Sequence, residues 1–131
     1  MKTNQVAVWI DHNEAKIFHV SAETFETSSV RSPKHHVHRH PIGSAEKKSH
    51  PADAKHFFDE VVRGLEGAEA ILIVGPATAK LELIRHLHQH ARALEPKVVG
   101  VETVDHPSDG QLAAYVRQYF HAVDRMQGTS P

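Results

Sequence analysis

Two Asp-His dipeptides carry side chains that can bind metal ions or transfer protons. Asp11 and His12 follow the apolar run 6–10, and Asp105 and His106 follow the run 97–103. If the two pairs meet, their carboxylates and imidazoles could hold a divalent metal ion or act in acid-base chemistry. Alternatively, Asp11 fixes a turn and Asp105 precedes a helix, each accepting hydrogen bonds from nearby backbone amides. We favour this second, local interpretation.

The segment 32–50 concentrates positive charge and histidine, and its prolines and few apolar residues predict a long loop. The side chains that could contact phosphate groups there are Lys34, His35, His36, His38, Arg39, His40, Lys47 and Lys48. Phosphate contacts give affinity without sequence selectivity. Histidine protonation would strengthen such binding at lower pH. A solvated surface loop, or metal capture by the four closely spaced imidazoles, are the alternatives.

A third candidate is the turn after the apolar run 70–75. Helix amides near Thr78, together with Lys80, could bind an anion at the start of the next helix. The turn is not a P-loop, because it lacks the spaced second glycine and the Gly-Lys-Ser/Thr ending. It could equally be a plain strand-to-helix connection.

Apolar patterning predicts the elements that position these residues. Strands are expected at residues 6–10, 15–20, 24–31, 70–75 and 97–103. Helices are expected from residue 51 to about 64 or 67, from Pro76 to before Pro96, and after a capping box formed by Ser108 and Gln111. The inner face of the last helix should carry Leu112, Tyr115, Val116 and Tyr119. On the middle helix, His86 and His90 share one face, which we expect to face solvent.

Right-handed crossovers turn this βββαβαβα order into one fold. They favour an α/β, ribonuclease-H-like architecture with a mixed five-stranded sheet ordered 3-2-1-4-5 and helices on both faces. Strands 1, 3, 4 and 5 then run parallel, so their carboxyl ends share one edge. Open α/β sheets usually place their sites at such an edge. Both Asp-His pairs, the 32–50 loop and Thr78 should meet there.

Composition indicates one globular domain, which we expect to span residues 1–125, with a flexible tail at 126–131. The chain has 131 residues, of which 40% are hydrophobic and 24% charged, and no cysteine. These values are typical of a folded domain. No apolar run approaches the length of a membrane span, and no signal peptide is evident. We therefore expect a cytoplasmic protein without a membrane partner.

Three segments resemble a known family. They are Trp9-Ile-Asp-His-Asn-Glu-Ala-Lys-Ile-Phe18, Ile71-Leu-Ile-Val-Gly-Pro76 with Lys80 behind it, and Val98 to Thr103 before a polar helix start. Together they look like the middle domain of archaeal and eukaryotic class I peptide chain release factors, of Pelota-type ribosome-rescue proteins, and of stand-alone bacterial relatives of both. The resemblance covers nearly the whole chain, and it rests on pattern and element order.

The resemblance implies a role in translation but not the family's release chemistry. That chemistry depends on a Gly-Gly-Gln tripeptide in the loop between the third strand and the first helix, where this chain offers only Gly43-Ser44. The expected function is a non-catalytic module that binds the ribosome or structured RNA and needs no cofactor. The alternatives are a metal-dependent hydrolase using the Asp-His pairs, and a surface-attachment or protein-interaction protein.

Overall fold

The computed structural model describes residues 4–21, 24–32 and 51–126. The elements in chain order are β1 (Gln5–Ile10), β2 (Glu14–Val20), β3 (Phe25–Arg31), α1 (Pro51–Leu65), β4 (Ala70–Gly75), α2 (Ala79–His90), the 3-10 helix η3 (Glu95–Lys97), β5 (Val98–Thr103) and α3 (Asp109–Met126). Most of the expected basic loop, residues 33–50, and the expected tail beyond residue 126 lie outside the described residues.

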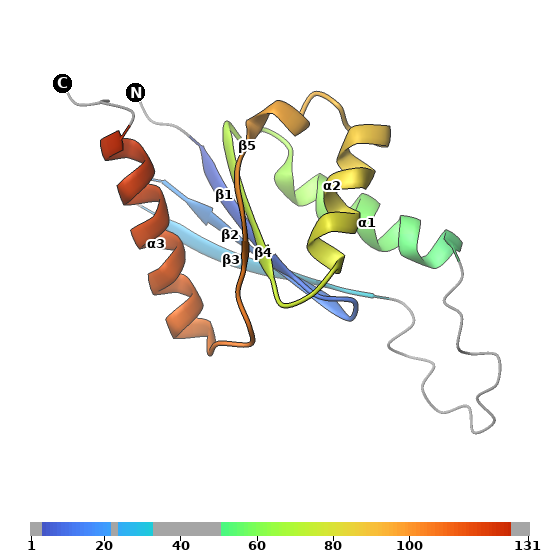
Figure 1. Ribbon diagram of the computed structural model, residues 1–131, viewed down its shortest axis with the longest axis horizontal. Helices are drawn as coiled ribbons and strands as arrows, with labels where there is room; N and C mark the ends of the chain where they lie inside the picture. Colours follow the sequence, from blue (N-terminus) through green and yellow to red (C-terminus); the bar gives the residue numbers. More distant parts are fainter. Residues whose placement is uncertain (1–3, 22–23, 33–50, 127–131) are drawn as a thin grey trace.

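The sheet has five strands in the order β3-β2-β1-β4-β5. β1 pairs antiparallel with β2 and parallel with β4; β2 pairs antiparallel with β3, and β4 parallel with β5. Strands β1, β3, β4 and β5 therefore run in the same direction. Helix α3 covers one face of the sheet, and α1 and α2 cover the other (Figure 1). The predicted fold and strand order are confirmed.

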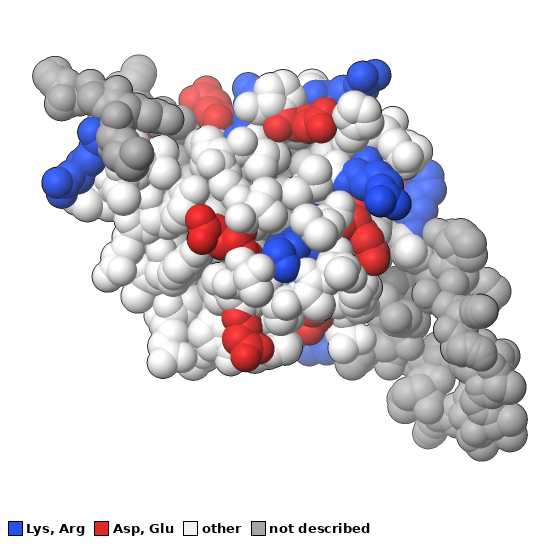
Figure 2. Space-filling view, viewed as in Figure 1, with Lys and Arg blue, Asp and Glu red and all other residues white. Residues whose placement is uncertain are grey.

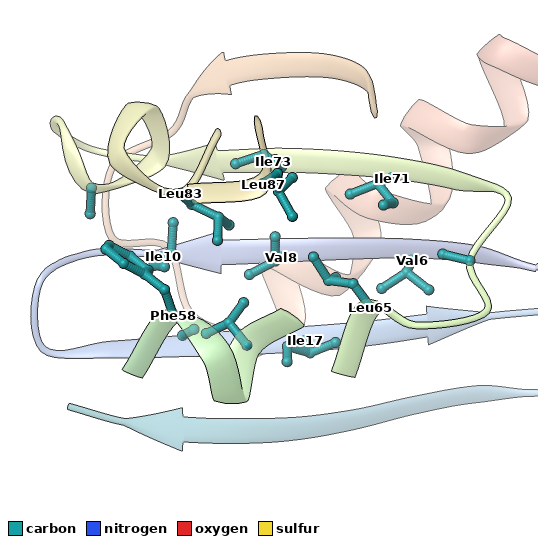
Figure 3. Packing of buried hydrophobic residues seen from close by; sticks show 14 of the residues in the cluster. Val6, Val8, Ile10, Ile17, Phe58, Leu65, Ile71, Ile73, Leu83 and Leu87 are labelled. Carbon is teal, nitrogen blue, oxygen red and sulfur yellow. The ribbon is translucent and has the colours of Figure 1, made fainter. Parts of the chain in front are cut away.

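The central strands β1 and β4 are buried along their whole length, because helices cover both faces. Alternate residues of β1 enter two different cores. Val6, Val8 and Ile10 pack under α1 and α2, as Figure 3 shows, whereas Ala7 and Trp9 pack under α3. This explains why β1 reads as a continuous apolar run rather than as an alternating one.

Helix α3 begins as predicted and buries Leu112 and Val116 of its predicted inner face, with Tyr115 partly buried beside them. The amide of Gln111 donates to Ser108 Oγ at 3.1 Å, and the amide of Ser108 donates to Gln111 Oε1 at 3.0 Å, which is a capping box. The buried stripe includes Phe120, which the prediction omitted, while Tyr119 is only partly buried. Tyr119 lies over Gly100, where a Cβ atom would come within 2.0 Å of its Oη.

Within the described part of the chain, no helix is long and apolar enough to cross a membrane.

Candidate functional site

The carboxyl ends of the parallel strands meet at one edge of the sheet, which we call the carboxyl edge. β1 ends beside β4 so closely that a Cβ atom on Gly75 would lie 2.2 Å from the backbone oxygen of Ile10. Glycine is therefore required at the end of β4. Asp11, after β1, lies near the loop 104–108 between β5 and α3, because its Oδ2 is 3.4 Å from His106 Nε2.

Asp11 fixes the turn between β1 and β2. Its Oδ1 accepts hydrogen bonds from the backbone amides of Asn13, at 2.8 Å, and Glu14, at 2.9 Å. The local role favoured from the sequence is thus confirmed for Asp11. Its second carboxylate oxygen remains available for a contact across the edge.

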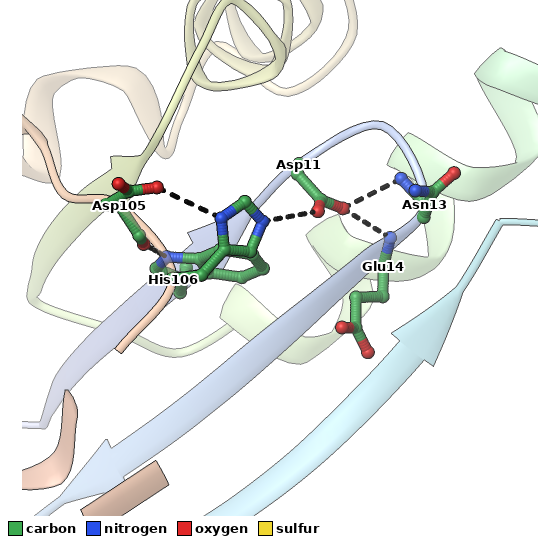
Figure 4. A network of polar contacts seen from close by, with 6 residues as sticks. Asp11, Asn13, Glu14, Asp105 and His106 are labelled. Carbon is green, nitrogen blue, oxygen red and sulfur yellow. Dashed lines mark hydrogen bonds and ion pairs between the residues drawn. The ribbon is translucent and has the colours of Figure 1, made fainter. Parts of the chain in front are cut away.

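That contact is with His106, whose imidazole lies between two carboxylates (Figure 4). Its Nδ1 is 3.1 Å from Asp105 Oδ1, and its Nε2 is 3.4 Å from Asp11 Oδ2. The ring also packs edge-on against Trp9, with 5.1 Å between ring centroids. The hydrogen bond to Asp105, and to a smaller extent the one to Asp11, raise the pKa of His106. Both stabilise the imidazolium form.

The loop that carries His106 is held to β1 by a backbone contact as well. Trp9 Nε1 donates a hydrogen bond to the backbone oxygen of Asp105 at 2.8 Å. In addition, Lys16 on β2 reaches Asp109 at the start of α3, with 2.7 Å between Nζ and Oδ1. The sequence carried no signal for this pair, because its members lie 93 positions apart.

The contacts of His106 connect the turn after β1 with the loop between β5 and α3. The two carboxylates meet opposite nitrogens of one ring, so they do not converge on a common point. No group of three or more histidine, aspartate or glutamate side chains that could hold a metal ion occurs among residues 4–21, 24–32 and 51–126. In its protonated form the ring has both N–H groups directed at carboxylates.

His12 does not join this group. Its Nε2 lies 3.3 Å from Glu82 Oε2 on α2. The structure therefore brings together Asp11, Asp105 and His106 of the four predicted residues. The side chains of Asp105 and His106 contact each other, whereas those of Asp11 and His12 have different partners. The spacing of the residues in the sequence does not predict this difference.

The predicted anion site at the start of α2 has one exposed and one buried member. Thr78 is the N-cap residue, and its side chain makes no capping hydrogen bond. Lys80 is buried, and its ammonium group donates to the backbone oxygen of Ala77. The eight basic and histidine side chains predicted in the 32–50 loop lie outside the described residues.

The expectation that His86 faces solvent is wrong. The residue is 6% exposed, and its Nε2 lies 2.8 Å from Asp59 Oδ1 on α1. Helix α1 packs on α2 and covers this face, which helical spacing alone does not reveal. His90, on the same face, is exposed as predicted.

On the face drawn in Figure 2, the described residues form no basic patch comparable to the basic segment of the sequence. Lysine, arginine, aspartate and glutamate side chains are interspersed there, and the coloured residues form no continuous basic patch. In the sequence, positive charge is concentrated between Lys34 and Lys48.

No family model matches the chain, and no curated protein matches it significantly. Solved structures share its fold. The Pelota protein of Thermoplasma acidophilum is 24% identical with a TM-score of 0.60, over 88% of this chain and 32% of that one. Archaeoglobus fulgidus Pelota is 16% identical with a TM-score of 0.59, over 95% and 38%. An archaeal translation termination factor is 13% identical with a TM-score of 0.55, over 94% and 39%.

At these identities the likeness shows the fold alone. The chain spans about a third of the length of those proteins.

Proposed function

We propose that this chain is a non-catalytic binding module of the translation machinery, and that it binds the ribosome or structured RNA. The observation that carries the proposal is the shared fold, which extends over 88% of the chain in one Pelota protein and 94% in a translation termination factor. Fold alone does not determine function. The proposal therefore also needs a surface that could make the contact.

The basic segment supplies that surface. Residues 33–50 contain Lys34, Arg39, Lys47 and Lys48 against a single acidic residue, Glu46. The segment follows Ser32, which is buried and whose amide donates to the backbone oxygen of Asn13 at 2.8 Å. Ser32, directly before the segment, therefore lies beside the turn between β1 and β2, at the carboxyl edge. Lysine and arginine there would neutralise phosphates, and the affinity would fall with salt.

Hydrolysis of peptidyl-tRNA is not part of the proposal. The family that the sequence resembles depends on a Gly-Gly-Gln tripeptide in this segment, and the chain has Gly43-Ser44 there. A module without that tripeptide could still bind the ribosome or structured RNA. We therefore assign binding rather than catalysis.

Co-sedimentation with ribosomes from a lysate, at low and at high salt, tests the proposal. The loop variant replaces Lys34, Arg39, Lys47 and Lys48 with alanine. The matched control replaces four exposed arginines of the described surface, Arg63, Arg85, Arg92 and Arg125, with alanine. Both variants lose the same formal charge, so only the position of the charge differs.

Salt-sensitive co-sedimentation of the wild type, lost in the loop variant and retained in the control, is the expected result. The salt dependence should become shallower in the loop variant, because fewer counterions are released. Absence of the wild type from the ribosome pellet at low salt would contradict the proposal. Equal loss in both variants would reduce it to nonspecific charge attraction.

A further inference from the structure

His86 is a buried titratable side chain that the proposed binding function does not use. It lies on α2 and points at α1, where its ring is 5.4 Å from that of Phe58 between centroids. On its own helix the ring is 4.7 Å from that of His90. The imidazole is therefore enclosed by one aromatic ring from each helix.

The charged groups that face His86 come from both helices. Asp59 on α1 contacts the ring, but Lys55 shares this carboxylate, with 2.9 Å between Lys55 Nζ and Asp59 Oδ2. Lys55 and His90 both act against a positive charge on His86. Lys55 already neutralises part of the negative charge of Asp59, so Asp59 is a weaker counterion for protonated His86.

Burial favours the neutral form of the His86 imidazole over the protonated form. Transfer of the imidazole from water into this interface disfavours its cation, and this desolvation is the largest cause lowering the pKa of His86. Contacts with Asp59 oppose the effect without cancelling it. The native interface therefore contains neutral His86 at neutral pH.

We propose that His86 is an acid-sensitive switch that holds the first half of α1 on α2 only while its imidazole is neutral. Phe58 and Asp59 are the α1 residues that touch it. Farther along α1, Val61 and Leu65 are fully buried in the apolar core and have no titratable partner there. Protonation would thus loosen residues 54–60 before the rest of the helix.

Hydrogen exchange of the full chain, measured between pH 5.5 and 7.5 and corrected for the intrinsic rates, tests this switch. In the wild type, exchange of residues 54–60 should rise by up to about tenfold on acidification, since pH 5.5 lies one unit below the ordinary histidine pKa of 6.5 and one unit corresponds to a tenfold change in an equilibrium constant. Exchange of residues 61–65 should change less. The variant His86→Gln, which cannot be protonated, should lose the pH dependence.

His88→Gln is the matched control, because His88 lies on the same helix but is exposed and paired with Glu95. It should behave like the wild type. Lys55→Met is a second test that leaves the buried site intact. Without the competing cation, Asp59 should stabilise protonated His86 better. The rise in exchange of residues 54–60 on acidification should therefore become smaller.

Flat exchange of residues 54–60 in the wild type would overturn the proposal. So would a pH dependence in His86→Gln equal to that of the wild type. If His86→Gln does not fold at pH 7.5, Lys55→Met decides the question, and an unchanged pH profile in that variant rejects the switch.

Discussion

Two histidine–aspartate contacts in this protein have opposite properties. His86 meets Asp59 at 2.8 Å between α1 and α2, with a histidine side chain that is 7% exposed. His106 meets Asp11 at 3.4 Å on the carboxyl edge, with a histidine side chain that is 62% exposed. Burial lowers the pKa of His86, whereas hydrogen bonds to Asp105 and Asp11 raise that of His106. The surroundings of each histidine–aspartate pair therefore determine the direction in which the histidine pKa shifts.

The two contacts should respond to pH in opposite directions. His86 has a folded pKa below its ordinary value of 6.5, so the unfolded chain binds the proton more readily. Its contribution to stability is complete above pH 6.5 and declines as the pH falls towards the lowered pKa. His106 has a raised folded pKa, so its contribution is complete below pH 6.5 and is lost as the pH rises through that raised pKa.

The largest expected difference between the two histidines comes from removing one carboxylate partner of each. Asp59→Ala leaves buried His86 without its hydrogen-bond partner, which should lower the free energy of unfolding by about 1–3 kcal/mol. Asp105→Ala removes a carboxylate with a 93% exposed side chain, and should change it by less than about 0.5 kcal/mol. Urea unfolding at pH 7 measures both. Equal losses would show that burial does not separate the two contacts.

A smaller effect separates the two roles of Asp11. Asp11→Ala removes the acceptor for the amides of Asn13 and Glu14, and should lower stability by about 1 kcal/mol. Asp11→Asn keeps a side-chain oxygen for the turn and loses only the charge near His106. It should therefore retain most of the stability in urea unfolding at pH 7. A loss as large as that of the alanine variant would mean that charge, not the turn, is the main contribution.

The smallest effect is expected at His106, because the contact is exposed to solvent. His106→Gln should remove the decline in stability that the raised pKa produces in the wild type as the pH rises above 6.5. Urea midpoints of both proteins between pH 6 and 8.5 give the comparison. The midpoints should differ most at pH 6 and converge at pH 8.5. A constant difference across this range would exclude a titrating contact.

Much of the fold was predictable from local patterns. The order of the elements follows from apolar runs and helical spacing, and the right-handed crossover rule then leads to the observed strand order. Ser108 and Gln111 predicted the start of α3, and Asp11 predicted the turn after β1. The hydrogen bonds that these residues make join positions at most three apart. Such short-range hydrogen bonds are determined by neighbouring residues and do not require the tertiary structure.

The candidate site was less predictable. Strand direction placed Asp11, Asp105 and His106 at one edge, but not the orientation of their side chains. His12 turned to Glu82 instead, and Lys16 found Asp109. Each of these contacts crosses between elements whose relative position depends on packing.

The sequence by itself determined the elements, their order in the sheet and the concentration of positive charge between residues 32 and 50. Only the tertiary structure decided that His86 is buried and that His106 lies between two carboxylates. The physical reason is that periodicity specifies which residues share a face of one element. Packing between elements determines which neighbour covers that face, and with it the pKa shifts of His86 and His106.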